Sequence, residues 1–240
     1  MPSSPSRQIR LRALIAKPFA HRGLHGEGRA ENSRAAFEAA IAAGHGIELD
    51  VQASADGEAI VIHDYELERL TEGRGAVRTL PAAELGRIRL KGSDETIPTL
   101  SEILALVAGR APLLIEVKSP GRRVAGLSRA VIRALNGYDG PVGVMSFNPE
   151  IARRIARQAP QLLRGLVVSE QGKGWRGLWE RPFALWRARP DFLAYDIRDL
   201  PSRFAAAQGL PVLTWTCRSG EDRARAARHA DQIIYEVPPP

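Results

Sequence analysis

The sequence predicts one α/β domain, a (β/α)8 barrel with a small hairpin and rim insertion after its second strand. Three observations favour this fold: eight short apolar runs, strand-helix alternation between them, and a length of 240 residues without a dividing linker. A closed barrel needs eight strands and commonly takes about 250 residues. The runs lie near Phe19, Ile47, Leu113, Val142, Leu163, Phe192, Val212 and Ile233.

The first strand-helix unit has clear boundary signals. Ser33 can cap a helix running from Arg34 to Ala43, because a serine side chain accepts hydrogen bonds from the first free backbone amides. Gly44 then ends the helix, since glycine readily adopts the conformation that follows a helix end. The next predicted strand is Gly46–Val51.

The segment after that strand departs from the simple repeat. Only Gln52–Glu58 separates it from Ala59–His63, whereas a crossover between parallel strands needs about a dozen residues. We therefore expect Ala59–His63 to be an antiparallel hairpin arm outside the barrel count. Residues 65–99 would then form an excursion at the rim, and Leu100–Val107 a helix leading into the third barrel strand.

The terminal segments and the composition of the chain indicate the cellular compartment that we expect. Residues 1–16 are expected to be a flexible tail and residues 17–240 the single barrel domain. The start lacks a long apolar signal region, and no run of about 20 apolar residues could cross a bilayer. The single cysteine is compatible with a reducing compartment. These features favour a cytoplasmic protein.

The formal net charge of +7 has an ordinary explanation. The basic residues are scattered and nearly all are arginine, so we expect no nucleic-acid partner but a surface that attracts anionic substrates. Aromatic residues recur from Trp175 to Trp186 at roughly helical spacing. We expect this stripe to pack against the barrel, with no stable membrane association. The alternative is an interfacial surface that docks on lipid.

Acidic side chains occur where apolar runs end. Glu48 and Asp50 project from the same side of one strand, because strand residues two apart share a face. Glu116 and Lys118 have the same relation on another strand. Oxygen ligands suit Mg²⁺ or Ca²⁺, and three acids close together would repel one another without a cation. We therefore predict that Glu48, Asp50 and Glu116 bind one divalent metal ion.

Two histidines and two cations complete this constellation. His21 and His63 can exchange protons at neutral pH and are predicted to be the catalytic acid and base, in an order that the sequence leaves open. Arg22 and Lys118 are predicted to contact phosphate, although they could instead form salt bridges with the acids. Together these groups are suited to metal-assisted cleavage of a phosphate ester.

A series of motifs carries a resemblance to a known family. In order, they are His21-Arg22-Gly23, Glu31-Asn32-Ser33, Glu48-x-Asp50, Asp56-Gly57, His63-Asp64, Ile97-Pro98-Thr99-Leu100, Glu116-x-Lys118, Ser146-Phe147 and Trp215-Thr216. This series resembles the glycerophosphodiester phosphodiesterase family from about Pro18 to Glu236. Two rim positions depart from the family pattern, at Cys217-Arg218 and Tyr235-Glu236.

The resemblance implies a TIM-like barrel that hydrolyses glycerophosphodiesters to glycerol 3-phosphate and an alcohol. It also implies a divalent metal, with the two histidines as acid and base. Glu31 is expected to contact the substrate or the metal, unless it only caps its loop. Trp215 is expected either to form a wall against the glycerol moiety or to belong to the core.

Two other functions remain open from the sequence. One is a lysophospholipase D-like enzyme that acts on lipid phosphodiesters. The other is a barrel-shaped binding protein that has lost turnover, which the presence of both histidines and all three acids disfavours. The sequence decides neither the released alcohol nor whether water or the glycerol hydroxyl attacks phosphorus first.

Overall fold

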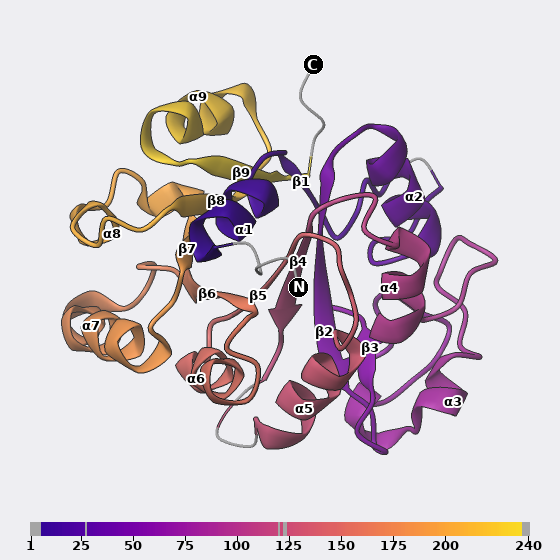
Figure 1. Ribbon diagram of the computed structural model, residues 1–240. Helices are drawn as coiled ribbons and strands as arrows, with labels where there is room; N and C mark the ends of the chain where they lie inside the picture. Colours follow the sequence, from indigo (N-terminus) through magenta and orange to yellow (C-terminus); the bar gives the residue numbers. More distant parts are fainter. Residues whose placement is uncertain (1–5, 27, 120, 122–123, 237–240) are drawn as a thin grey trace.

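The computed structural model describes residues 6–26, 28–119, 121 and 124–236, and these residues fold into a closed barrel of eight parallel strands (Figure 1). The strands are β1 (Phe19–His21), β2 (Gly46–Ala53), β4 (Leu113–Val117), β5 (Val142–Ser146), β6 (Leu163–Val168), β7 (Phe192–Asp196), β8 (Val212–Cys217) and β9 (Gln232–Tyr235). Strand β1 closes the barrel, because Ala20 pairs with Ile47 on one side and with Tyr235 on the other. The predicted fold class and all eight strand positions are confirmed.

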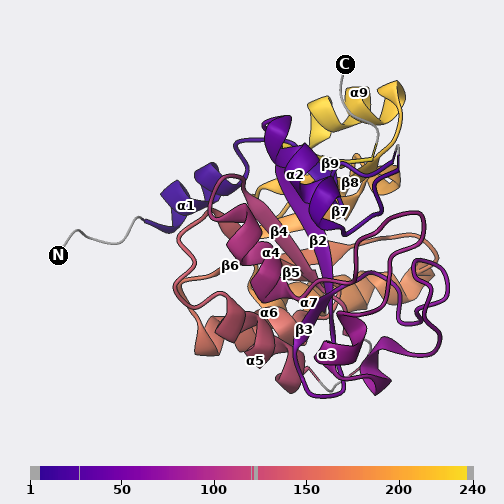
Figure 2. The ribbon, with the colours of Figure 1, turned by 90° about the vertical axis from the view of Figure 1, so that its right-hand side faces the viewer.

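Helices surround the strands and follow the predicted alternation (Figures 1 and 2). They are α2 (Arg34–Ala42), α4 (Leu100–Val107), α5 (Ala125–Ala134), α6 (Pro149–Gln158), α7 (Gly177–Ala188), α8 (Arg203–Ala206) and α9 (Gly220–His229). Ser33 caps α2 as predicted, accepting a hydrogen bond from the Ala36 amide at 3.1 Å. The helix ends one residue earlier than predicted, because Ala43 is its C-terminal cap.

The inward side chains change character along the barrel axis. A buried apolar cluster that includes Phe19, Leu114, Phe192 and Leu213 lies toward the amino ends of the strands. Phe192 packs over a strand position that has no side chain, since a Cβ at Gly165 would lie 2.3 Å from its ring. One barrel end is therefore packed solid, and the polar inward positions of the same strands lie at the other end.

The amino-terminal prediction needs a correction. Residues 7–14, assigned above to a flexible tail, form helix α1 (Arg7–Leu14), and Leu14 is fully buried. The Leu14 side chain approaches Gly143 so closely that a Cβ there would lie 2.7 Å away. Arg7 also pairs with Asp191. The apolar stripe of this helix is too short to stand out in the sequence. Residues 1–5 of the predicted tail lie outside the described residues.

The predicted hairpin and rim insertion are confirmed. Strand β3 (Ala59–Val61) pairs antiparallel with β2, with Val51 opposite Val61. The insertion that follows contains the 3-10 helix η1 (Val77–Thr79) and helix α3 (Ala82–Leu85), and it lies to one side of the barrel (Figure 2). It has its own apolar cluster, made of Ile60, Ile62, Leu67, Val77, Leu85, Leu90 and Ile97.

The aromatic stripe does not pack against the barrel, so that prediction is wrong. The stripe begins in the 3-10 helix η2 (Gly174–Arg176) and continues along α7. The side chains of Trp175, Trp179, Phe183 and Trp186 are all exposed. The physical reason is that α7 contacts the barrel through smaller side chains, including the buried Ala188 and the half-buried Ala184 and Leu185.

The packing of α1 can be tested by removing a buried side chain. We expect Leu14→Ala to lower the free energy of unfolding by about 2–5 kcal/mol, because it leaves a cavity at the solid end of the barrel. Ile9→Ala on the same helix is the control, since Ile9 is exposed and its loss should cost about 0.5 kcal/mol or less. Urea unfolding measures both. Equal effects of the two substitutions would contradict a barrel that includes α1.

Candidate active site

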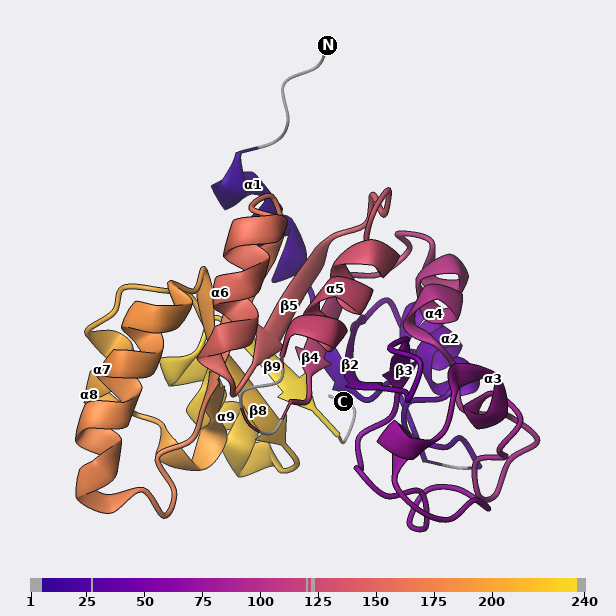
Figure 3. The same ribbon diagram turned by 90° about the horizontal axis from the view of Figure 1, so that it is seen from below.

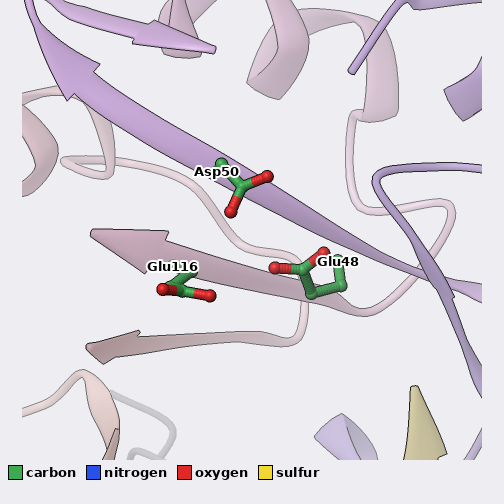
Figure 4. Close-up of side chains that lie close together, drawn as sticks. All are labelled: Glu48, Asp50 and Glu116. Carbon is green, nitrogen blue, oxygen red and sulfur yellow. The ribbon is translucent and has the colours of Figure 1, made fainter. Parts of the chain in front are cut away.

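Three buried carboxylates lie together at the carboxyl ends of two neighbouring strands. Glu48 and Asp50 project from β2, and Glu116 projects from β4 directly opposite Asp50 (Figure 4). One oxygen from each lies within 4.8 Å of the others. The predicted convergence of these acids is therefore present, and it arises because the two parallel strands pair in this register.

The electrostatics of the cluster fit a bound cation. Burial, together with Asp50 and Glu116, raises the pKa of Glu48 well above its usual range, and burial also raises the pKa of Glu116. Burial acts the same way on Asp50, but Lys118 and Arg22 outweigh it and lower the Asp50 pKa. Oε1 of Glu48 has no hydrogen-bond partner among the described residues. An oxygen-only set with a free buried oxygen suits a hard divalent ion.

The predicted phosphate-binding cations also contact the acids. The Nζ atom of Lys118 lies 3.1 Å from Oδ1 of Asp50 and 2.7 Å from Oε1 of Glu116. The Nε atom of Arg22 lies 3.2 Å from Oδ2 of Asp50. These are the salt bridges considered as the alternative role. Lys118 and Arg22 also line the cleft described below, so ion pairing does not remove them from a substrate's reach.

His21 is held at the end of β1 by a carboxylate that the sequence analysis did not assign to the site. Its Nδ1 lies 2.9 Å from Oε1 of Glu236, and Arg218 pairs with the same carboxylate. The other ring nitrogen, Nε2, lies 3.9 Å from Oε2 of Glu48 and so faces the acidic cluster. Burial lowers the pKa of His21 despite its hydrogen bond to Glu236, which favours the neutral ring.

The turn after His21 explains the His-Arg-Gly motif. Arg22 and Gly23 both have left-handed backbone angles, with φ of 58° and 80°. A Cβ at position 23 would lie 2.8 Å from the Cβ of Ala36, so only glycine fits beneath helix α2. The turn brings the Arg22 backbone amide within 3.1 Å of Oε2 of Glu48, to which it donates a hydrogen bond. Backbone geometry thus fixes one metal-ligand candidate.

His63 approaches the site from the rim insertion. Its Nδ1 lies 2.6 Å from Oδ1 of Asp64, which leaves Nε2 for the cleft. Asp64 is itself held by Arg69, whose hydrogen bond is the main cause that lowers the Asp64 pKa to about 2. The Gln52 amide on β2 donates to the His63 carbonyl at 2.7 Å. Both histidines therefore have one nitrogen anchored on a carboxylate.

Glu31 connects Arg22, beside the acidic cluster, to Arg69, beside the His63–Asp64 pair. Its Oε1 lies 2.7 Å from Nη1 of Arg22 and 3.0 Å from Nη2 of Arg69. The residues that line the cleft do not include it, so the geometry favours an orienting role for Glu31 over substrate contact. Asn32 also has such a role, because its amide donates to Oδ2 of Asp50 at 3.1 Å.

A cleft of about 460 Å³ opens above the acidic cluster. Trp215 lines it, packs edge-on against Phe147 at 5.6 Å and donates its indole N–H to the Ala194 carbonyl at 2.9 Å. Trp215 therefore lies beside a second aromatic of the cleft, Phe147. The lining residues are His21, Arg22, His63, Glu116, Lys118, Phe147, Asp196, Ile197, Arg198, Trp215, Thr216, Arg218 and Asp222.

The sequence analysis missed the anchors of the histidines. Glu236 was noted only as a departure from a family pattern, and Asp64 only as part of a motif. Glu236 follows the last strand, so the rule that found Glu48 and Glu116 could also have found it. Arg69 carried no such signal, because it lies in the insertion and reaches Asp64 and Glu31 only through the fold.

The fold and the site define a class of protein. This is a TIM-barrel enzyme, with two histidines and a cluster of carboxylates at the end of the barrel where such enzymes carry out their chemistry. The sequence profile of the glycerophosphoryl diester phosphodiesterase family matches residues 21–238. The chain belongs to this family and is a phosphoric diester hydrolase.

Individual relatives agree over nearly the whole chain. A glycerophosphodiester phosphodiesterase of Caldanaerobacter subterraneus is 36% identical over 238 residues, which cover 92% of this chain and 93% of the relative. The solved structure of an Oleispira antarctica phosphodiesterase, in complex with the product sn-glycerol-3-phosphate, is 26% identical, with a TM-score of 0.78 over 93% of this chain and 94% of that one. A Silicibacter pomeroyi structure, a putative glycerophosphoryl diester phosphodiesterase, is 26% identical, with a TM-score of 0.80 over 95% and 94%.

Within the described ranges, every helix is too short or too polar to cross a bilayer.

The anchoring of His21 gives a test of Glu236. We expect Glu236→Gln to lower kcat for glycerophosphodiester hydrolysis by about 10-fold to about 10⁴-fold with little change in KM, because it removes the charge that orients the ring. Glu236→Asp should recover part of the loss. Glu221→Gln on the exposed surface of α9 is the matched control. A change confined to KM would instead assign Glu236 to substrate binding.

Proposed function

We propose that this protein hydrolyses glycerophosphodiesters to glycerol 3-phosphate and an alcohol, with one divalent cation, Mg²⁺ or Ca²⁺, and with His21 and His63 as acid and base. The observation that carries the proposal is the shared location of the three buried carboxylates and the two anchored histidines around one cleft. Family membership supports the substrate class.

Glu48, Asp50 and Glu116 would hold the cation. A divalent ion bound there would neutralise phosphate charge and polarise the ester. Burial and the neighbouring acids raise the pKa values of Glu48 and Glu116, and a bound cation would offset both effects. Asn32 and the Arg22 amide would keep Asp50 and Glu48 in place through the hydrogen bonds described above.

Lys118 and Arg22 would bind the non-bridging oxygens of the phosphate. Both line the cleft beside the acids, and a guanidinium offers several donors in a fork that matches phosphate oxygens. Glu31 supports this role indirectly, since its ion pair with Arg22 restricts the orientation of that side chain.

The two histidines would transfer the protons of the displacement. One accepts a proton from the attacking hydroxyl, and the other donates a proton to the leaving alcohol oxygen. Anchoring on Glu236 and Asp64 supports this role, because a carboxylate on Nδ1 favours the tautomer whose Nε2 faces the reacting group. Trp215 and Phe147 would form the apolar wall against the glycerol moiety.

The substrate is proposed to be a small molecule. The Oleispira antarctica relative binds sn-glycerol-3-phosphate, and the cleft volume of about 460 Å³ is in the range typical of small-molecule sites.

The direct test is release of glycerol 3-phosphate from glycerophosphocholine, with and without a chelator. A panel that includes glycerophosphoethanolamine, glycerophosphoinositol and lysophosphatidylcholine identifies the alcohol and separates this proposal from a lysophospholipase D. Failure of every substrate with metal present would favour a binding protein.

The metal site can be tested by removing one carboxylate. We expect Glu48→Gln to weaken binding of Mg²⁺ or Ca²⁺ and to lower activity by at least about 100-fold, because a neutral amide is a poorer ligand for a hard cation. Isothermal titration calorimetry measures the metal affinity independently of turnover. Glu84→Gln, at an exposed position of α3, is the control. Full activity of Glu48→Gln after chelator treatment would refute the assignment.

The histidine pair can be tested by single and double substitution. His21→Ala and His63→Ala should each lower kcat by about 100-fold or more, and the losses should not add, since either one interrupts the same displacement. A substrate with an activated leaving group needs no proton donor, so it should rescue only the variant that lacks the acid. Rescue of both variants, or of neither, would contradict divided roles.

A further inference from the structure

A stripe of large aromatic side chains faces solvent on the outer flank of the barrel. Trp175, Trp179, Phe183 and Trp186 are 73%, 75%, 60% and 61% exposed, and Leu178 beside them is 64% exposed. We call these five residues the α7 aromatic face. The four aromatics follow one another at intervals of three or four residues, so they share one side of the helix, and Leu178 lies next to Trp179. Helix α7 itself lies at the periphery of the molecule (Figures 1 and 3).

The α7 aromatic face takes no part in the packing of α7 against the barrel. Helix α7 packs inward through Gly177 and Ala188, with Ala184 and Leu185 partly buried against the core. Arg181 also turns inward, where its guanidinium lies 5.5 Å from the Phe204 ring. The outer aromatics therefore add exposed apolar area on the order of 500 Å², estimated from the size of such side chains. A patch of this size on a monomer commonly marks a binding surface.

Cations surround the α7 aromatic face. Lys173 and Arg176 lie at its beginning and Arg189 just after its end, and all three are exposed. Where Trp186 meets helix α6, a groove of about 250 Å³ is lined by the guanidinium-bearing residues Arg153, Arg157, Arg187 and Arg189. Arg153 and Arg187 share the carboxylate of Glu150. Within the described part of the chain, Arg157, Arg176 and Arg189 have no ion-pair partner.

We propose that the α7 aromatic face docks this enzyme on an anionic phospholipid membrane. The tryptophans and Phe183 would enter the interface between headgroups and acyl chains, and the arginine groove would bind lipid phosphate. Aromatics rimmed by Lys and Arg are the composition of interfacial helices. The exposure of these aromatics removes the alternative in which they close the barrel.

The charges favour a membrane over a second copy of this chain. A two-fold interface places the same patch of each subunit against its own image. The cations around the α7 aromatic face would then meet one another, and the exposed acid on the helix, Glu180, is already paired with Lys173. An anionic bilayer supplies the opposite charge over the whole patch.

Docking through α7 would leave the active-site cleft open. The stripe begins in η2, after the carboxyl end of β6, and runs along the flank toward the opposite barrel end, where the Arg189 carbonyl accepts a hydrogen bond from Arg164 at the start of β6. The residues that line the cleft include none of the face. Membrane binding would therefore place the enzyme at the bilayer without altering turnover of a water-soluble substrate, which goes beyond the proposed function.

Vesicle co-sedimentation tests the proposal. At physiological salt, we expect wild-type protein to sediment with vesicles of phosphatidylcholine and phosphatidylglycerol and not with phosphatidylcholine alone. The double variant Trp179→Gln/Phe183→Gln should bind at least tenfold more weakly, and Arg157→Gln should lose part of the salt dependence. Ile9→Gln is the matched control, because Ile9 is also an exposed apolar residue on a basic helix.

Several outcomes would overturn the proposal. Wild-type protein that stays in the supernatant with anionic vesicles would do so, as would an equal loss of binding in Ile9→Gln. Sedimentation velocity without lipid provides another: a wild-type dimer that Trp179→Gln/Phe183→Gln converts to monomers would assign the face to a second copy. Circular dichroism checks that each variant is folded. Because the assay measures bound protein, it does not depend on the outcome of the activity tests.

Discussion

The active site depends on one electrostatic constraint, which is that three carboxylates are buried within 4.8 Å of one another. Like charges so close, and out of water, are unfavourable unless cations compensate them. Lys118 and Arg22 supply part of that compensation, which is enough to keep the pKa of Asp50 low but not those of Glu48 and Glu116. This incomplete compensation is the basis of our proposal that the site binds a divalent ion.

The surrounding residues fix geometry as well as charge. A chain of hydrogen bonds and ion pairs connects His63 to the acidic cluster, through Asp64, Arg69, Glu31 and Arg22 in turn. His21 has its own anchor, because Arg218 holds Glu236 against the ring. Each proposed catalytic imidazole is thus oriented by a carboxylate that an arginine in turn orients. This arrangement joins the barrel and the rim insertion into one site, although the two have separate apolar clusters.

Local sequence signals predicted most of the barrel and the centre of the site, because both follow short-range rules. The helices and strands could be located from strand periodicity, the Ser33 cap and the short link before Ala59. The spacing of two residues between Glu48 and Asp50 predicted that they share one face of the strand. What the sequence could not predict depends on tertiary contacts. Leu14 is buried because a distant glycine leaves room for it, and Arg69 joins the site across 38 residues. The prediction that the α7 aromatics pack against the barrel was wrong for a related reason. Their helical spacing indicates an apolar stripe, but it does not indicate which side of the helix faces the barrel.

The inward side chains change from apolar at one end of the barrel to polar at the other, and this has a consequence for how the protein tolerates substitution. At one end, Phe192 and Leu14 occupy the space above glycines, so a larger residue at Gly143 or Gly165 would clash with these buried side chains. At the other end, Arg198 in the 3-10 helix η3 (Ile197–Asp199) has a largely exposed side chain, and a substitution there would change the rim and not the strand register. Tolerance to mutation is therefore graded from the closed end to the mouth. Substitutions at exposed rim positions can therefore reshape the mouth of the cleft while the packing of the closed end stays unchanged.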